Sequence, residues 1–335
     1  MKFDSPVRRV RFLFAIVLAS FLGIPHAYSS LDRVWAELTP MPEGRSGMIA
    51  IITQKLEPAY YGGSSWDENG KRIHATGFVY RDNEWRPLIS LKNPIAYAAV
   101  ARNEGLLYIA GGTDGSDLKP SLLSISPHLQ QTTIEINPSQ AHIYAGAAFV
   151  EHAFYLLGGS TKISPLTASA TISKFEQGSW ENVGQLPEGS LINPAVVSFS
   201  GNILVFGGGI LKAEGLKNTD SVYSFATANR AWTKVSRLPD PIRGAVALSI
   251  PDTGILLIGG YIEPSTFSSQ VVFFDHKKKE FHSLARLPMG LMLPGVVATE
   301  KYVYVFGGEN APKHRSNRLF RAPLTKLMQI IASEL

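Results

Sequence analysis

The chain has 335 residues, of which 45% are hydrophobic and 18% are charged, and its formal net charge is +5. This balance predicts a folded globular protein and excludes a disordered or fibrous one. The absence of cysteine excludes disulfide scaffolds, thiolate metal sites, iron–sulfur clusters and cysteine nucleophiles. The 30 glycines and 21 prolines favour a turn-rich β protein, because both residues interrupt helices.

Residues 1–29 have the layout of a secretory signal peptide. Four cations precede an apolar stretch, Phe12–Ile24, and small residues follow up to Ser29. Since a membrane-spanning helix needs about 20 apolar residues, this stretch favours cleavage near Ser29 and a periplasmic or secreted protein over a retained membrane anchor. The segment holds four cations and one aspartate, so its removal takes +3 from the +5 and leaves +2. The remaining chain has no basic patch suited to nucleic acid.

Six apolar segments farther along the chain end in a pair of glycines. The first glycines of these pairs are Gly62, Gly111, Gly158, Gly207, Gly259 and Gly307. Their successive intervals are 49, 47, 49, 52 and 48 residues. A repeat of this length is typical of the kelch type, in which each unit forms one four-stranded blade of a propeller.

Each repeat is expected to supply four strands. In the fifth repeat these are Gly244–Ile250, Ile255–Gly260, Gln270–Asp275 and a segment that begins at Phe281 and ends in Leu-Pro. The two inner strands are continuously apolar and the outer two alternate, which predicts that the inner strands lie nearest the axis. The unit near Thr132–Ile136 lacks the aromatic residue that begins the fourth strand elsewhere, and we expect a degenerate blade there.

The two ends of the repeat region complement one another. A fourth-strand segment, Trp35–Pro42, stands before the first repeat, while the last repeat ends at Asn317–Leu324 without a fourth strand. Pairing these segments closes the ring and removes the exposed sheet edges. The sequence therefore predicts an all-β fold, a six-bladed kelch β-propeller over residues 30–324, closed by the N-terminal strand joining the last blade. Residues 325–335 are expected to be a C-terminal tail, either a short helix or a frayed end.

One face of such a propeller gathers the turns that join successive blades and the turns between second and third strands. Ligand sites favour convergent loops on a rigid scaffold. The turns between blades contribute Arg45, Tyr97, Tyr144, Asn193, Arg243 and Met292. The other turns contribute Trp66, Glu263, Glu309, His314 and Arg315. We expect these side chains to surround a funnel at the axis.

Ordinary structural roles compete with binding roles for these residues. Arg45 and Arg243 either bind a ligand or bridge backbone carbonyls of adjacent blades, and Tyr97 either contacts a ligand or packs at the channel wall. The segment 309–315 is the strongest candidate, because it combines an acid, a base and a cation within seven residues. The sequence contains no nucleophile elbow, zinc-protease motif or phosphate-binding loop, and it predicts no metal site.

The glycine pairs and the Trp-to-Leu-Pro strands resemble the kelch β-propellers. Within them, the segments 60–72 (YYGGSSWDENGKR), 94–117 (PIAYAAVARNEGLLYIAGGTDGSD) and 242–249 (IRGAVALS) resemble the bacterial N-acetylneuraminate (sialic acid) mutarotase group, including its circularly permuted members. This resemblance implies an exported enzyme that interconverts the α and β anomers of free sialic acid without a cofactor. It also implies a carboxylate and an arginine in the funnel. Galactose oxidase, another kelch-type propeller, needs a Tyr–Cys crosslink that this chain cannot form.

The resemblance assigns provisional roles to the candidate residues. Glu309 or Glu263 would be the base and His314 or a water the acid, with general acid–base catalysis contributing roughly 10²–10⁴-fold. Arg45 or Arg243 would hold the sugar carboxylate through a bidentate contact. The remaining substrate-binding candidates are Tyr97, Trp66, Asn193 and Arg315. The partner would then be a small sugar acid, and a homodimer or protein partner stays open. The alternative function is a non-catalytic carbohydrate- or protein-binding propeller.

Overall fold

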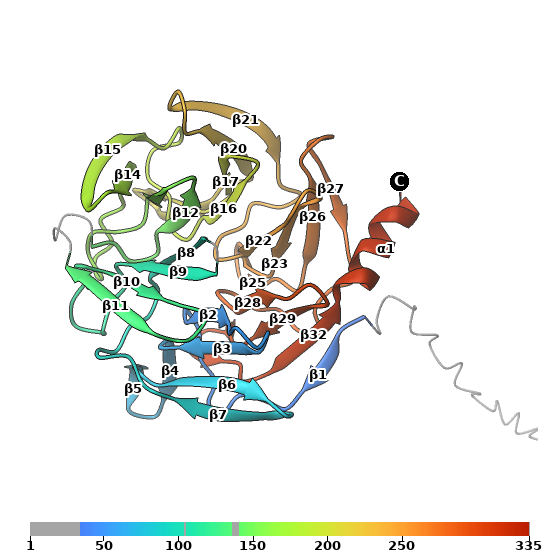
Figure 1. Ribbon diagram of the computed structural model, residues 1–335. Coiled ribbons are helices and arrows are strands. Elements are labelled where there is room, and N and C mark those ends of the chain that lie inside the picture. The colour runs from blue at the N-terminus through green and yellow to red at the C-terminus, as the bar shows by residue number, and fades with distance from the viewer. Residues whose placement is uncertain (1–33, 104, 136–140, 335) are drawn as a thin grey trace, which may run out of the picture.

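The computed structural model describes residues 34–103, 105–135 and 141–334, and the expected signal peptide lies outside them. Within these residues, six four-stranded antiparallel sheets surround a central axis (Figure 1). Each sheet has the strand order of a propeller blade, and the first strands of neighbouring blades contact one another around the axis. This arrangement confirms the predicted all-β fold with six blades.

The strands are given from the axis outward. The first blade consists of β2 (Ile49–Ile52), β3 (Pro58–Tyr61), β6 (Gly77–Arg81) and β7 (Glu84–Leu88). The second consists of β8 (Ala99–Asn103), β9 (Leu106–Ala110), β10 (Ser121–Ile125) and β11 (Gln131–Glu135). The third consists of β12 (Gly146–Val150), β13 (Ala153–Leu157), β14 (Thr171–Glu176) and β15 (Ser179–Gln185). The fourth blade consists of β16 (Ala195–Phe199), β17 (Asn202–Phe206), β20 (Ser221–Ala226) and β21 (Ala231–Arg237). The fifth consists of β22 (Val246–Ile250), β23 (Gly254–Ile258), β26 (Val271–Asp275) and β27 (Glu280–Ser283). The sixth consists of β28 (Gly295–Ala298), β29 (Tyr302–Phe306), β32 (Leu319–Pro323) and β1 (Ala36–Leu38). The second blade, although it lacks the aromatic residue, still forms its fourth strand.

Four blades carry an extra two-stranded hairpin between their second and third strands. These hairpins are β4 (Ser64–Asp67) with β5 (Gly70–Ile73), β18 (Gly209–Lys212) with β19 (Gly215–Asn218), β24 (Tyr261–Ile262) with β25 (Thr266–Phe267), and β30 (Glu309–Ala311) with β31 (His314–Arg315). Because all four follow a glycine pair, they emerge on the same side of the ring, which we call the hairpin face.

The ring closes through the N-terminal strand, as predicted. β1 pairs antiparallel with β32, with Ala36 opposite Arg321 and Leu38 opposite Leu319. Trp35 is 7% exposed, and its Nε1 donates a hydrogen bond to the Ala285 carbonyl in the fifth blade at 2.8 Å. Helix α1 (Leu324–Glu334) follows β32 and packs its apolar residues into the same cluster. The two ends of the described chain are therefore fastened to the same blade.

The glycine pairs attach each blade to the next. In every pair the N–H of the second glycine donates to a carbonyl oxygen in the turn that enters the next blade, at 2.7–2.8 Å. The six bonds are Gly63 to Ile95, Gly112 to His142, Gly159 to Leu191, Gly208 to Ile242, Gly260 to Leu291 and Gly308 to Arg45. The same carbonyl oxygen lies 2.1–2.6 Å from the position that a Cβ of the first glycine would occupy. Only glycine fits there.

A second set of backbone hydrogen bonds encircles the axis. Six residues just before the inner strands have φ between 51° and 67°, and each donates its N–H to the equivalent carbonyl of the preceding blade at 2.8–3.2 Å. These residues, which we call the axial ring, are Gly47, Tyr97, Tyr144, Asn193, Gly244 and Leu293. The last bond runs from Gly47 to Leu293 and joins the first blade to the sixth. This ring places Tyr97, Tyr144 and Asn193 around the axis.

We predict that alanine at Gly111 destabilises the fold more than alanine at Gly178. Both glycines have a left-handed φ, +68° and +83°, so alanine costs about 1–2 kcal/mol at either position. At Gly111 the His142 carbonyl oxygen lies 2.1 Å from the new Cβ, whereas nothing lies within 4 Å at Gly178. We expect Gly111→Ala to lose a further ~1–3 kcal/mol of unfolding free energy, measured by chemical denaturation. Equal losses would contradict this account of the glycine pair.

Candidate functional site

Arg45 and Arg243 occupy different positions relative to the axial ring. Arg243 stands one residue before its axial-ring residue, Gly244, while Arg45 stands two residues before Gly47. The residues equivalent to Arg45 in the other blades are all buried: Ile95, His142, Leu191, Ile242 and Leu291. Arg45 is 3% exposed and points into the protein in the same way.

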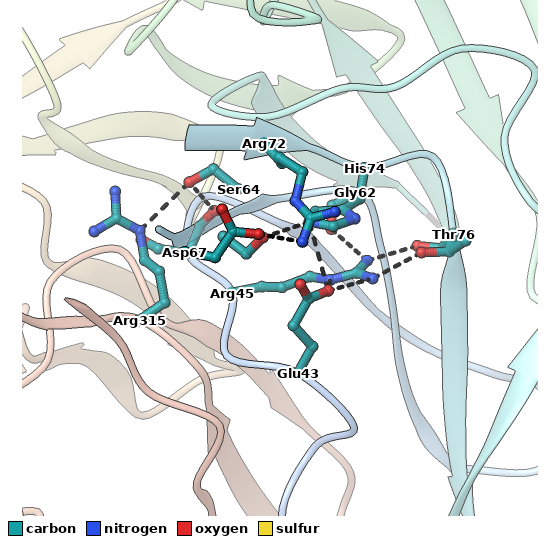
Figure 2. A network of polar contacts seen from close by, with 11 residues as sticks. Glu43, Arg45, Gly62, Ser64, Asp67, Arg72, His74, Thr76 and Arg315 are labelled. Atoms are coloured by element: carbon teal, nitrogen blue, oxygen red, sulfur yellow. Dashed lines mark hydrogen bonds and ion pairs between the residues drawn. The ribbon is translucent and has the colours of Figure 1, made fainter. Parts of the chain in front are cut away.

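The Arg45 guanidinium is fully engaged inside the first blade (Figure 2). Its Nη1 donates to the carbonyls of Gly62 and Thr76, both at 3.0 Å, and its Nη2 donates to Thr76 Oγ1 at 2.7 Å. Its Nε donates to Glu43 Oε2 at 3.2 Å. Arg45 therefore bridges backbone carbonyls, although both carbonyls belong to its own blade rather than to a neighbouring one.

His74 borders the same polar network (Figure 2). Its Nε2 lies 2.7 Å from Ser65 Oγ and 3.5 Å from Glu43 Oε2. Burial, reinforced by the positive charge of Arg45, lowers the pKa of His74 below its ordinary value of 6.5. The imidazole is therefore neutral at pH 7.

Glu309 and Arg315 do come together. They are opposite one another in the β30–β31 hairpin, and Arg315 Nη1 lies 2.9 Å from Glu309 Oε1. The Arg315 side chain is 5% exposed and the Glu309 side chain 21%. Arg315 also donates, at 3.4 Å each, to Ser64 Oγ in the first blade and to Tyr97 Oη in the second. Ser64 Oγ and Tyr97 Oη are 2.5 Å apart. We call Ser64, Tyr97, Tyr144, Glu309 and Arg315 the axial cluster.

Tyr144 supplies a proton donor to the axial cluster. Its ring lies 4.9 Å from the Tyr97 ring at an interplanar angle of 54°. Burial raises the pKa of Tyr144 above its usual 10, and the negative charge of Glu309 adds to this effect. The Tyr144 hydroxyl therefore stays protonated at neutral pH.

His314 does not converge with Glu309. Adjacent side chains of a strand point to opposite faces, and His314 is adjacent to Arg315, so it lies on the other face of the hairpin. It is exposed, and its Nδ1 is 2.5 Å from Asn310 Oδ1. The predicted Glu309–His314 acid–base pair is not assembled by this geometry.

Arg243 and Glu263 form a separate cluster on the hairpin face. Arg243 Nη1 donates to Asn218 Oδ1 at 2.6 Å and lies 3.6 Å from Glu263 Oε1, while its guanidinium stacks 4.4 Å from the centre of the Tyr261 ring. Burial lowers the pKa of Arg243. Since Asn218 belongs to the fourth blade and Tyr261 to the fifth, Arg243 bridges two adjacent blades through side chains.

Trp66 and Asn193 lie at the edges of the axial cluster. Trp66 is on β4, where the Lys313 ammonium lies 5.4 Å from the centre of its ring. Asn193 is half-buried in the axial ring. The exposed Lys71 lies above Tyr97, with its Nζ 4.5 Å from the ring centre, and adds a cation at the rim.

Sequence reasoning missed Ser64 and the role of Tyr144 as a donor. Ser64 directly follows a glycine pair, which is also the position of Glu309 in the sixth blade. Comparing that position across all six repeats would have selected both residues. Among the described residues, no group of three histidine or acidic side chains could hold a metal ion. None of the helices in the described ranges is long and apolar enough to span a membrane.

Comparisons with known proteins agree with this architecture. Residues 243–288 match the model of the kelch motif. Beta-scruin of Limulus polyphemus is 24% identical, and the match covers 86% of this chain and 33% of that protein. Kelch-like protein 38 of Rattus norvegicus is 26% identical, and the match covers 46% of this chain and 26% of that protein. The chain thus spans about a quarter to a third of these relatives. The solved structure of YjhT matches with a TM-score of 0.61 at 16% identity, over 71% of this chain and 84% of that one. Fold and motif together define a six-bladed β-propeller that carries a kelch motif.

We predict that His74 makes stability depend on pH near neutrality. Because its pKa is lower in the folded protein than 6.5, the unfolded chain binds more protons as the pH falls through about 6.5. The stability that neutral His74 contributes is present above that pH and is lost as the pH falls toward the folded-state pKa. Unfolding free energies measured at several pH values should show this loss in the wild type and a flatter curve for His74→Gln. The matched variant His152→Gln changes an exposed turn residue, and a flattening as large as that of His74→Gln would contradict the assignment.

Proposed function

We propose that the protein is an exported mutarotase that interconverts the α and β anomers of N-acetylneuraminate, a free sugar acid, at the axial cluster. The observation that carries this proposal is the Glu309–Arg315 pair of the sixth blade, held beside Tyr97 and Tyr144 in the turns that enter the second and third blades. Polar and charged side chains that converge at the loops of a rigid scaffold are typical of a functional site. The sequence resemblance to the mutarotase group supplies the substrate.

Anomer exchange requires one base and one acid. The base takes the proton of the anomeric hydroxyl, the bond between the anomeric carbon and the ring oxygen breaks, and the ring oxygen takes a proton. The open-chain ketone then rotates, and the same steps in reverse close the ring on its other face. Glu309 is the base in this proposal, and the Tyr144 hydroxyl, which is protonated at neutral pH, is the acid. Tyr144 thereby replaces His314, which faces away.

The substrate carboxylate is attracted by the cations of the cluster. Arg315 makes two long contacts, both 3.4 Å, to Ser64 and Tyr97, and a carboxylate would replace them with shorter charge-assisted hydrogen bonds. Lys71 at the rim provides a second positive charge. Arg45, whose donors are occupied by backbone and Thr76, has no part in this binding. Trp66, which is half-buried on β4, offers apolar surface to the sugar ring.

NMR exchange spectroscopy of the two N-acetylneuraminate anomers tests the enzyme directly. We expect the protein to accelerate exchange over buffer, and Glu309→Gln to lower that acceleration about 10²-fold or more, because it removes the base. His314→Gln is the matched control on the opposite face of the same hairpin and should exchange the anomers like the wild type. No acceleration by the wild-type protein would contradict the proposal.

A binding module is the second candidate, since Glu309 and Arg315 already neutralise one another in the described structure. It predicts saturable binding of N-acetylneuraminate, measured by calorimetry, with anomer exchange no faster than in buffer. Loss of that binding in Arg315→Met would indicate that the sugar binds at the axial cluster, whether the protein is a mutarotase or a binding module.

Export is part of the proposal and rests on residues 1–29. N-terminal sequencing of the protein recovered from the periplasm or the medium should find a chain that begins just after Ser29. Recovery of the uncleaved chain in the cytosol would contradict export.

A further inference from the structure

The axis of the propeller contains a cavity that begins at Tyr97 and Tyr144 of the axial cluster and extends beyond them. Its volume is about 420 Å³, and the inner strands of all six blades line it. The walls below the axial ring are apolar and small, as at Ala98, Val100, Ala147, Val196 and Ala247. Sites for small organic ligands have volumes of about 300–1,000 Å³ and mainly apolar walls with a few polar groups. The cavity matches this description.

One charged side chain, Arg102, lines the cavity. Arg102 is the fourth residue of β8, and its Nη2 donates to the Ala50 carbonyl on the inner strand of the preceding blade at 2.8 Å. No carboxylate among the described residues forms an ion pair with it, and the other side chains that line the cavity are uncharged. A guanidinium has five N–H donors, and among the described residues that of Arg102 donates to one acceptor, the Ala50 carbonyl.

The enclosure of Arg102 makes an anion favourable there. The side chain is accessible to solvent from within the channel. The protein atoms around it remove part of its hydration, which lowers the pKa of Arg102 to about 10. It is therefore still charged at neutral pH. A charge held among apolar walls loses part of its hydration, which a bound counter-charge offsets.

Two hydroxyl groups lie at the same level of the channel as Arg102. Counting from the axial ring, Arg102 is the fifth residue after Tyr97, while Ser198 and Ser249 are the fifth residues after Asn193 and Gly244. Both serines line the cavity. Phe149, the fifth residue after Tyr144, lines the cavity at this level too, so the end of the channel remote from the hairpin face presents one cation, two hydroxyls and one aromatic ring. The walls between this end and the axial ring are apolar.

We propose that this channel binds a small amphipathic carboxylate, with its carboxylate on Arg102 and its apolar body along the alanine- and valine-lined walls toward the axial ring. The division of the cavity into one cationic end and an apolar length selects this class over a sugar, which would leave its hydroxyl groups unpaired against the walls. The inference does not rest on the proposed mutarotase activity, because Arg102 is outside the axial cluster.

Calorimetric titration with octanoate tests the site. We expect saturable one-to-one binding to the wild-type protein, and binding of the uncharged octan-1-ol about tenfold weaker or worse, because the alcohol forms no ion pair. Arg102→Met should weaken octanoate binding by about tenfold or more. Sodium sulfate, which carries charge without an apolar body, should not compete. Equal affinity for octanoate and octan-1-ol, or no saturable octanoate binding, would overturn the proposal.

A second variant tests the site without changing Arg102, so that a folding defect in Arg102→Met can be distinguished from loss of the site. Ala247→Phe fills the channel from β22 and leaves Arg102 in place, so it should abolish octanoate binding. Thermal unfolding of both variants verifies that they fold, and anomer exchange should be unchanged in Arg102→Met. Octanoate binding that survives Ala247→Phe in a folded protein would show that the ligand lies elsewhere and would overturn the assignment.

Discussion

The structure depends on one hydrogen bond that is made six times, from the second glycine of a pair to a carbonyl in the turn entering the next blade. The bond fixes the separation of adjacent blades, and it requires glycine at the preceding position, where the same carbonyl occupies the space of a Cβ. Each blade then buries its apolar faces against both neighbours, as Phe154 and Leu156 do against Ala99 and Leu122. A single backbone geometry therefore accounts for the glycine pair in every repeat and for the way each blade joins the next.

The closing copy of this bond assembles the candidate site. Gly308 donates to the Arg45 carbonyl, and this contact brings the hairpin that follows Gly308 against the first blade. Arg315 consequently reaches Ser64 and Tyr97, which are 251 and 218 residues away in the sequence. The axial ring contributes the rest, because its left-handed backbone holds Tyr97 and Tyr144 side by side at the axis. The candidate chemistry belongs to the closed ring rather than to any one repeat.

The sequence predicted the blades and their closure because glycine pairs and apolar periodicity are local signals. The placement of the candidate residues was predicted in part. Glu309 and Arg315 were selected together and do face each other, but His314 was grouped with them because sequence distance does not reveal the alternation of a hairpin. Arg45 and Arg243 were given equivalent positions, because the spacing of the repeats does not reveal a difference of one residue. Arg45 lies two residues before the axial ring instead of one, and its side chain therefore points into the blade. Arg102 was not predicted to belong to a site, because the sequence of an inner strand does not show which of its side chains faces a cavity.

We propose that closure of the ring creates the sugar-acid site at the axial cluster, and a crystal structure of the protein soaked with N-acetylneuraminate tests this. We expect density for the sugar at the hairpin face, with its carboxylate on Arg315 and its anomeric hydroxyl next to Glu309. Sugar bound at the outer strands, or beside Arg243 with the axial cluster unchanged, would contradict it.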